Sequence, residues 1–548
     1  MSSGEHSNED CEANEDPLAE AFEQIKLGRY DNALAILRFL SDRGERRAKS
    51  ALARMYQCGY GVDIDADYAL KLYREAAEAG DPVGQYQLGS SYLHGSGVYQ
   101  DYEAAGYWLS ESARQGNGDA INDIGTMIFH GLHFDKSEEA AIEMYKISSE
   151  RGSAAGQFNY GIVLIQNEKA SFRQLGIDCL REAANQGHAK AQSKLALAYI
   201  EGLIVTRDPI EAYRLFHLAA DSGDLDGLCG LGMCYAGGDG CEKDLRQANA
   251  LFERAAENGH AQAQFNLAWS YHNGEGIERD DVIAMRWYSA AAKQGHSGGI
   301  RGVGQMFELG SGGVDKNLPM AADYYERAAD LGDIIAEYNM GVIYQYGTAR
   351  HIDLIKSAAY YERAAQKGYS SAQLNLGLLL QAGVKGAPDY KMAMHWLQEA
   401  ARSGHPKANG AIGHLYLNGL GVKKAVNTAI KHIEQSALLG DCGSQYNLAL
   451  LFGGVNDCPV DMERRVYWLT QASKQGYAAA QVELAIAYAK GDGTSIDMVE
   501  SYKWALLGRK GEDPRGNDVC EIVERDISAA EKAEGVRRAN DFSRQNFT

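Results

Sequence analysis

The sequence predicts an all-α solenoid of about 13 helix–loop–helix repeats with a cap at each end. One observation is a glycine that recurs every 35 to 37 residues. A second is that each interval repeats two helical patterns around a loop that usually contains glycine. A third is that no proline falls inside a predicted helix, where it would cost about 3 kcal/mol. The recurring glycines are Gly44, Gly80, Gly116, Gly152, Gly187, Gly223, Gly259, Gly295, Gly332, Gly368, Gly404, Gly440, Gly476 and Gly511.

The stretch from Gly259 to Gly295 contains one complete repeat. A first helix is predicted over 261–272 and a second over 281–293. Gly274 and Gly276 lie in the loop between them, where a positive φ is needed. Because almost the whole chain repeats this unit, its function has to be sought in a repeat array.

The chain divides into a tail, a cap, the repeats and a second cap. Residues 1–16 hold six acidic residues and no Lys or Arg, which predicts a disordered acidic tail. Residues 17–44 predict a short N-terminal capping helix pair, and 512–548 a C-terminal helical cap and tail. The predicted repeats between them, over 45–511, are 45–80, 81–116, 117–152, 153–187, 188–223, 224–259, 260–295, 296–332, 333–368, 369–404, 405–440, 441–476 and 477–511.

A small residue recurs in the middle of the first helix, as in Leu231-Gly232 and Met340-Gly341. A glycine inside a helix costs about 1 kcal/mol relative to alanine, so its recurrence indicates a close approach of two helices. The second helix carries a large aromatic residue seven or eight residues before the closing glycine, such as Phe252 and Tyr361. We therefore expect large side chains of one helix to pack on small residues of the next.

Charge and composition disfavour several classes of protein. The formal net charge of −20 disfavours nucleic acid as a partner, because phosphate binding needs clustered Lys and Arg. No run approaches about 18 apolar residues, so we expect no membrane insertion. The acidic N-terminus has no features of a secretory signal. We expect a cytoplasmic protein, and export by a specialised secretion system is the alternative.

Nine scattered cysteines without a CxxC motif indicate reduced thiols. Cys11 is the first of them, in the acidic tail. Cys234 and Cys241 could approach each other across one loop. We expect free thiols there, and a disulfide is the alternative in an exported relative.

The segments Gln85–Val98 (QYQLGSSYLHGSGV) and Gln264–Ile277 (QFNLAWSYHNGEGI) resemble the Sel-1-like repeat family, a longer-loop relative of the tetratricopeptide repeat. The resemblance extends over about 17–511, and the short first unit and helical C-terminal extension are similar to those of bacterial members. It implies a right-handed α/α superhelix. It also implies an adaptor, scaffold or regulator that binds other proteins.

The best candidate site is a row of asparagines on the first helices. In related tetratricopeptide arrays the residue before the apolar–small pair points into the concave groove. That residue is Asn159, Asn266, Asn339, Asn375 and Asn447 here, with Gln87 and Asp123 in other repeats. An amide both donates and accepts, so such a row could bind the backbone of an extended peptide. The alternative is that these amides pair with an adjacent repeat.

Aromatic residues stand beside the asparagines, one position earlier. They are Tyr86, Phe158, Phe265, Tyr338 and Tyr446. Trp269 stands out because it replaces a small or polar residue on the groove side. Exposed aromatic residues often anchor partners. Of these aromatics, Phe265 and Trp269 join the asparagines as candidate partner-binding residues, with packing between repeats as the alternative.

Histidines suggest a structural role rather than a site. His130 and His133 with Asp135 could hold a metal, but we expect none. His188, His260, His296 and His405 follow a closing glycine, at a capping position of the repeat.

No motif for a nucleophile, a metalloprotease or a phosphate-binding loop is present. We therefore expect no enzyme and no cofactor. The predicted function is a non-enzymatic protein–protein interaction scaffold with a partner peptide or domain in its groove. The alternative is a regulatory inhibitor or secreted effector that acts on a specific enzyme or host protein. The sequence does not identify the partner and does not address self-association.

Overall fold

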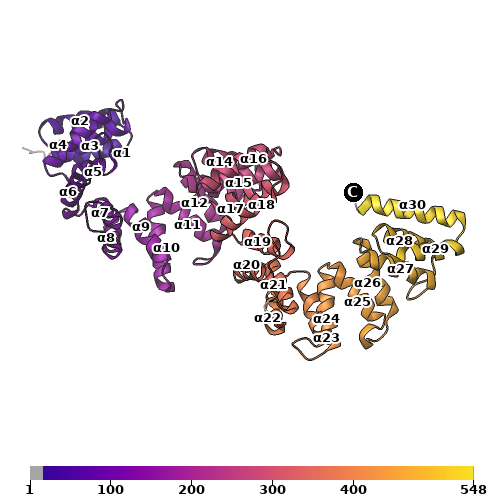
Figure 1. Cartoon of the computed structure of the whole chain (residues 1–548). Helices are drawn as coiled ribbons and strands as arrows, with labels where there is room; N and C mark the ends of the chain where they lie inside the picture. The colour runs from indigo at the N-terminus through magenta and orange to yellow at the C-terminus, as the bar shows by residue number, and fades with distance from the viewer. Residues whose placement is uncertain (1–15, 385, 547–548) are drawn as a thin grey trace, which may run out of the picture. The chain divides into compact units, whose positions relative to one another are not determined.

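A computed structural model describes residues 16–384 and 386–546 of the chain. These residues form 30 α-helices and one short 3-10 helix, with no strand among them (Figure 1). They divide into two compact units, one that ends at Arg279 and one that begins at Asp280. Most of the predicted tail, including Cys11, lies outside the described residues.

The first unit consists of the N-terminal cap and successive helix pairs. Its helices are α1 (Pro17–Lys26), α2 (Tyr30–Asp42), α3 (Arg46–Cys58), α4 (Ala66–Glu78), α5 (Pro82–His94), α6 (Tyr102–Arg114), α7 (Gly118–His130), α8 (Glu138–Glu150), α9 (Ala154–Ile165), α10 (Ala170–Asn185), α11 (Ala189–Glu201), α12 (Pro209–Asp221), α13 (Leu225–Gly237), α14 (Leu245–Glu257) and α15 (Ala261–Asn273).

The second unit continues the pairs and ends in two further helices. Its helices are α16 (Asp281–Lys293), α17 (Ser297–Leu309), α18 (Leu318–Asp330), α19 (Ile334–Tyr346), α20 (Leu354–Gln366), α21 (Ser370–Ala382), α22 (Tyr390–Arg402), α23 (Ala408–Asn418), α24 (Val426–Leu438), α25 (Cys442–Phe452), η1 (Val455–Asp457), α26 (Met462–Lys474), α27 (Ala478–Lys490), α28 (Met498–Lys510), α29 (Arg515–Asp526) and α30 (Ala529–Asn546). No helix among the described residues combines the length and apolarity needed to span a bilayer.

Capping residues set most helix starts. Asp244 accepts hydrogen bonds from the backbone N–H groups of Arg246 and Gln247, and so begins α14. His188 and His296 accept the N–H three residues later through Nδ1, at 3.2 and 3.1 Å. The predicted capping role of these histidines is therefore confirmed, and it requires an unprotonated Nδ1.

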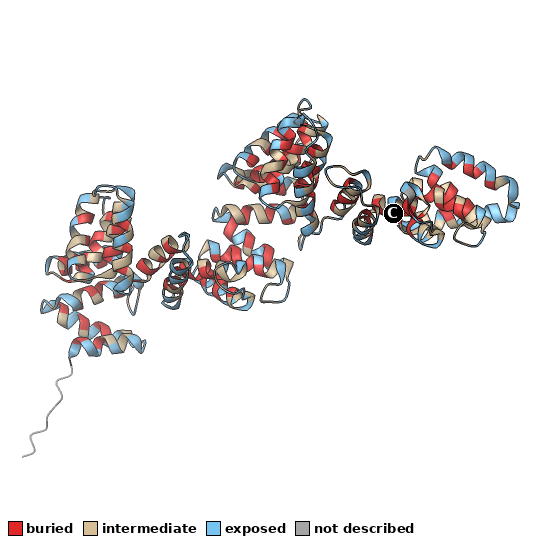
Figure 2. Cartoon of the chain, turned by 90° about the horizontal axis from the view of Figure 1, so that it is seen from below, coloured by how far each residue is buried: buried red, intermediate tan, exposed pale blue. Residues whose placement is uncertain are grey.

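The small residues of the first helices lie against large side chains of the second helices, as predicted. A Cβ added at Gly232 would lie 2.6 Å from the ring of Phe252. At Gly341 it would lie 2.5 Å from the ring of Tyr361, which is fully buried. Figure 2 shows buried residues along the helices of each unit. The recurring glycines thus allow an approach that a methyl group would prevent.

A second contact between repeats uses buried glutamines that the sequence analysis did not single out. Gln445 of α25 donates through Nε2 to the carbonyl of Ala437 in α24, at 3.0 Å. Its Oε1 accepts from Nε2 of Gln475, the C-cap residue of α26, at 2.8 Å. Gln85 of α5 is held in the same way between Ala77 of α4 and Gln115, the C-cap residue of α6. We call this arrangement the glutamine clamp, because it ties one first helix to the second helices before and after it.

In two of the repeats that carry the glutamine, the clamp is incomplete. Gln192 and Gln373 keep their hydrogen bonds to Ala184 and Ala365, but the Oε1 atom of each is buried without a hydrogen-bond partner. The residue before the next closing glycine is Gln475 in the complete clamp just described. It is Ser222 after Gln192 and Ser403 after Gln373. A serine side chain is two atoms shorter than glutamine and leaves the buried oxygen unpaired.

We predict that Gly341→Ala lowers the free energy of unfolding by about 1–3 kcal/mol, because the added methyl group overlaps Tyr361. Gly443 is the matched control, since the nearest atom to an added Cβ there is 3.6 Å away. Gly443→Ala should instead stabilise the protein by up to about 1 kcal/mol. Urea denaturation followed by circular dichroism measures both, and equal effects at the two glycines would contradict the packing argument.

We also predict that Ser403→Gln raises the free energy of unfolding by about 1–3 kcal/mol, since its amide supplies a donor to the buried Oε1 of Gln373. Ser403→Glu is the control, because a carboxylate of the same shape cannot donate. Urea denaturation should separate the two variants. A gain that Glu shares with Gln would show that the missing hydrogen bond is not the cause.

Candidate partner-binding groove

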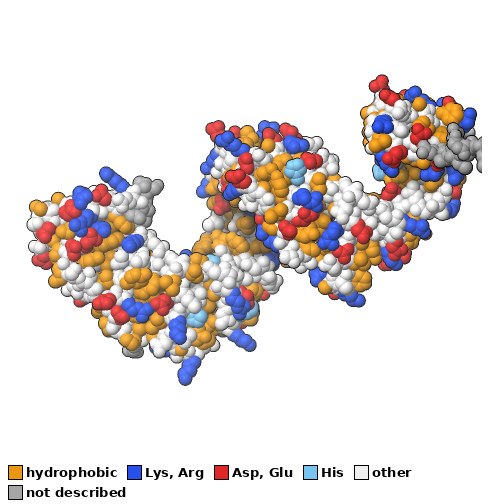
Figure 3. Space-filling view, turned by 180° about the vertical axis from the view of Figure 1, so that it is seen from behind, with side chains coloured by type: hydrophobic (Ala, Val, Ile, Leu, Met, Phe, Trp, Pro, Cys, Tyr) orange, Lys and Arg blue, Asp and Glu red, His pale blue; other side chains and the backbone are white. Residues whose placement is uncertain are grey.

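The predicted site residues all lie on first helices, at corresponding places in their repeats. The first unit has Asn159 on α9 and Phe265, Asn266 and Trp269 on α15. The second unit has Asn339 on α19, Asn375 on α21 and Asn447 on α25. Within each unit the structure therefore places them on one set of helices. Figure 3 shows hydrophobic side chains in patches on the surface of both units.

Three of the asparagines pair with the preceding repeat. Asn159 Nδ2 donates to Asn122 Oδ1 at 2.8 Å, and Asn266 Nδ2 approaches Cys229 Sγ at 3.7 Å. In the second unit Asn375 hydrogen-bonds the side chain of Tyr338. Each partner stands 37 residues earlier in the sequence. These amides therefore connect neighbouring first helices, and their binding of a partner stays a prediction.

Asn447 is exposed, in contrast to these three half-buried amides. The residue 37 positions before it is Gly410, which has no side chain to offer. The Asn447 side chain thus stays at the surface. Asn339 is half-buried.

The aromatic residues before the asparagines pack between repeats. The ring of Phe158 stacks on His188 at 4.9 Å, and the rings of Tyr338 and Tyr446 lie 5.1 Å from those of Tyr369 and Tyr477. Phe265 is half-buried. These contacts support the packing alternative for that column of aromatic residues.

Trp269 differs because it is 39% exposed. It forms a row with Leu197 of α11 and Met233 of α13, which are 37% and 42% exposed. All three stand ten residues after a closing glycine, in three successive repeats. We call Leu197, Met233 and Trp269 the apolar row. The sequence analysis identified only Trp269, although the shared spacing was a signal for the other two.

A cavity of about 240 Å³ opens beside the apolar row. Met233 of α13 and Asn266 and Trp269 of α15 line it, together with Phe252 of α14 and Glu275 of the following loop. We call it the anchor cavity. It brings together two of the predicted residues, Asn266 and Trp269, with two that were not predicted, Met233 and Phe252.

The second unit has exposed apolar side chains beside its own asparagines. Ile335 and Tyr346 of α19 are 41% and 64% exposed, on either side of Asn339 in the helix. Leu378 of α21 is 43% exposed and occupies the repeat position of Trp269. Residues three, four and seven apart share a helix face, so these side chains flank the asparagines.

Asp123 of α7 occupies the asparagine position in its own repeat. Its burial disfavours the charged form of the carboxyl group. Its Oδ1 accepts from Asn122 Nδ2 at 3.2 Å. Burial raises the pKa of the Asp123 carboxyl to about 6, while the Asn122 hydrogen bond and the nearby His94 act in the opposite direction. Perturbed pKa values such as that of Asp123 are often found at functional sites.

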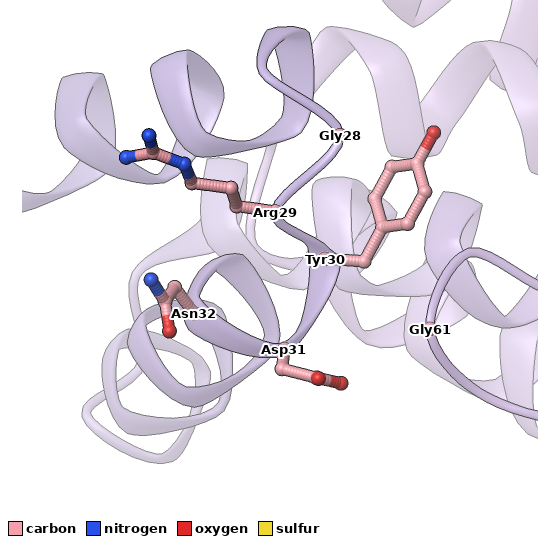
Figure 4. Close-up of a pocket in the computed structure, with 6 residues that line it drawn as sticks. All are labelled: Gly28, Arg29, Tyr30, Asp31, Asn32 and Gly61. Carbon is pink, nitrogen blue, oxygen red and sulfur yellow. The ribbon is translucent and has the colours of Figure 1, made fainter.

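Another cavity, of about 390 Å³, lies at the N-terminal cap. Gly28, Arg29, Tyr30, Asp31 and Gly61 are among the residues that line it. Figure 4 shows the Arg29, Tyr30 and Asp31 side chains pointing in different directions. The cavity therefore has no converging set of polar groups, and none of the predicted site residues lines it.

The described part of the chain contains no group of three or more His, Cys, Asp or Glu residues arranged to hold a metal ion. His130 and His133 are both exposed. Cys234 and Cys241 are free thiols, as expected. Burial raises the pKa of Cys234 to about 12, so its thiol is protonated at neutral pH.

The repeat pattern matches a known family model, which is described as the Sel1 repeat. The matches cover 47–81, 82–117, 118–153, 154–188, 189–224, 225–260, 261–296, 299–333, 334–369, 370–405, 406–441, 443–477 and 478–509. The chain belongs to the Sel1 repeat family. Its thirteen Sel1 repeats confirm the predicted all-α solenoid. Sel1 and tetratricopeptide-like repeat proteins generally mediate protein–protein interactions, and Sel1 scaffolds are generally not catalysts.

Solved structures with the same repeats resemble this Sel1 array. A protective antigen present in uropathogenic Escherichia coli strains, described as displaying an SLR fold, is 25% identical. That likeness covers 87% of this chain and 95% of the antigen, with a TM-score of 0.57. A Sel1 repeat protein from Oxalobacter formigenes is 26% identical over 61% of this chain and 95% of its own, with a TM-score of 0.36. A comparison with curated proteins found no match.

We predict that Asp123→Asn stabilises the Sel1 array at pH 7 by on the order of 1–3 kcal/mol. Because the folded pKa of Asp123 is raised, the unfolding free energy falls as the pH rises from about 4 through about 6. The gain from the variant should accordingly shrink between pH 7 and pH 4. Urea denaturation of the wild type and the variant at pH 7 and at pH 4 measures this difference in the free energy of unfolding.

Asp226→Asn is the control of opposite sign. The His260 hydrogen bond lowers the pKa of Asp226 to about 2, with a further contribution from Lys194. The Asp226 carboxylate therefore stabilises the protein at neutral pH, and this contribution is lost as the pH falls. Asp226→Asn should therefore weaken the protein at pH 7. A destabilising Asp123→Asn would contradict the charge argument.

Proposed function

We propose that this Sel1-repeat chain is a non-enzymatic adaptor that holds a segment of a partner protein against its first helices. The observation that carries the proposal is the apolar row of Leu197, Met233 and Trp269, which is exposed beside Asn266. Contiguous exposed apolar side chains next to polar groups are typical of interaction sites. Trp is also among the residues that most often dominate binding energy.

The proposed partner is another protein. Apolar side chains of the first helices would anchor it, and asparagine amides would replace hydrogen bonds within the array by hydrogen bonds to the partner. Asn159 and Asn375 already bond within the array, so a partner would have to offer a better acceptor than they have. Asn447 is exposed and can bind without breaking such a bond. The proposed setting is the cytoplasm of a bacterium, and nucleic acid is not the proposed partner.

The test is affinity capture with mass spectrometry, followed by calorimetry with the captured protein. Replacing Asn266, Trp269 and Asn339 together by alanine should weaken binding by at least about 2 kcal/mol, the scale of a hot-spot residue. Helical content and melting temperature should stay unchanged, because the three side chains are not part of the buried core.

The matched control replaces three exposed apolar residues of second helices, Ile210, Met320 and Tyr467, by alanine. Unchanged affinity in the first triple variant, or an equal loss in the control, would argue against the groove. If the captured partner is an enzyme whose activity falls on binding, the chain is a regulatory inhibitor rather than an adaptor.

A further inference from the structure

The anchor cavity exists because a small residue stands at its edge. Ala236 of α13 lies thirteen residues after its closing glycine. The four preceding repeats have large apolar residues at that position, namely Leu93, Phe129, Ile165 and Ile200. With alanine in place of a branched or aromatic side chain, about 240 Å³ is left between α13 and α15, with α14 beneath.

The cavity has the size and lining of a pocket for one side chain. Phe252 at its base is 4% exposed, while Met233 and Trp269 at its rim are 42% and 39% exposed. A dry protein cavity of about 150 Å³ is enough to bind benzene. A leucine, methionine or phenylalanine side chain therefore fits between these residues.

Asn266 stands at the same cavity with a weaker partner than the other paired asparagines. Its Oδ1 accepts from Gln262 at 2.9 Å, and its Nδ2 faces the Cys229 sulfur at 3.7 Å. A neutral thiol is a poor acceptor, whereas Asn159 donates to an amide oxygen. The Asn266 N–H group thus gains the most by turning to the backbone carbonyl of a bound peptide.

One charged residue, Glu275, is among those that line the cavity, and it is exposed. The carbonyl of Glu275 accepts from Asn249 Nδ2 at 2.8 Å, which fixes this residue beside the pocket. The whole chain has a formal net charge of −20. Charge complementarity therefore favours a basic residue in the occupant next to its apolar anchor.

We propose that the anchor cavity binds a linear peptide segment of the partner through one bulky apolar side chain. In this arrangement the neighbouring Lys or Arg of the peptide pairs with Glu275, and its backbone carbonyl accepts from Asn266. The inference rests on the proposed function and assigns its occupant. A second copy of this chain, or a folded surface without such a segment, would be a different occupant.

The test is selection of random dodecapeptides displayed on phage against the full chain, with the Kd of enriched synthetic peptides measured by fluorescence polarisation. We expect a consensus of one Leu, Met or Phe next to Lys or Arg. Ala236→Ile, which introduces the side chain of Ile200 from the preceding repeat, should fill the cavity and raise the Kd by about 30-fold, the scale of a hot-spot loss.

A charge reversal supplies an independent readout. Glu275→Lys should leave the apolar preference in place and change the selected neighbour from Lys or Arg to Asp or Glu. Ile210→Ala is the matched control, because it removes an exposed apolar side chain of the second helix α12 and should leave the Kd unchanged.

Three results would contradict the proposal that the anchor cavity binds a linear peptide. They are a consensus without a bulky apolar residue, a Kd that Ala236→Ile leaves unchanged, and the absence of any enriched peptide. If peptide binding is lost in Leu378→Ala, a variant at the position of Trp269 in the second unit, but kept in Ala236→Ile, the site lies in the second unit and the adaptor proposal stands. If no peptide is enriched but the full chain binds a folded partner through Trp269, the anchor-cavity proposal is wrong and the adaptor proposal stands.

Discussion

A buried hydrogen-bonded contact, the glutamine clamp, holds one first helix between two second helices in the repeats that carry it. A solenoid has no central core, so each repeat is held only by its neighbours. Packing of Tyr361 on Gly341 buries apolar area, but such contact tolerates small shifts. A buried amide must find its partners at fixed distances, and Gln445 does so on both sides. Where it is complete, the clamp therefore fixes the register between a first helix and the second helices on either side of it.

Because each repeat is held by its neighbours, many side chains of the first helices are used in contacts between repeats and are not free to bind a partner. Asn159 and Asn375 lie on the first helices but are already bonded within the array. The column of Phe158, Tyr338 and Tyr446 is used in contacts between repeats. The proposed recognition therefore relies on side chains that the stacking does not use. In the first unit we propose the apolar row and the weakly bonded amide of Asn266.

The fold could be predicted from the sequence because its signals recur at a fixed period. Gly232 opposite Phe252 and the histidine caps followed from position alone. The glutamine clamp could not be predicted in this way, because a glutamine in a helix is as suitable for a solvated face as for a buried bond. The anchor cavity was also hidden. It depends on the absence of a large side chain at Ala236, and an alanine in a helix gives no signal by itself.

The two incomplete clamps have a consequence for an array under tension. Because the repeats within each unit contact one another in series, a pulling force acts in full on every junction of that unit. The junctions of Gln192 and Gln373 each lack a hydrogen bond that Gln445 makes. One lies in each unit, opposite Ser222 and Ser403. Among the junctions that carry the glutamine, these two should therefore open first under extension.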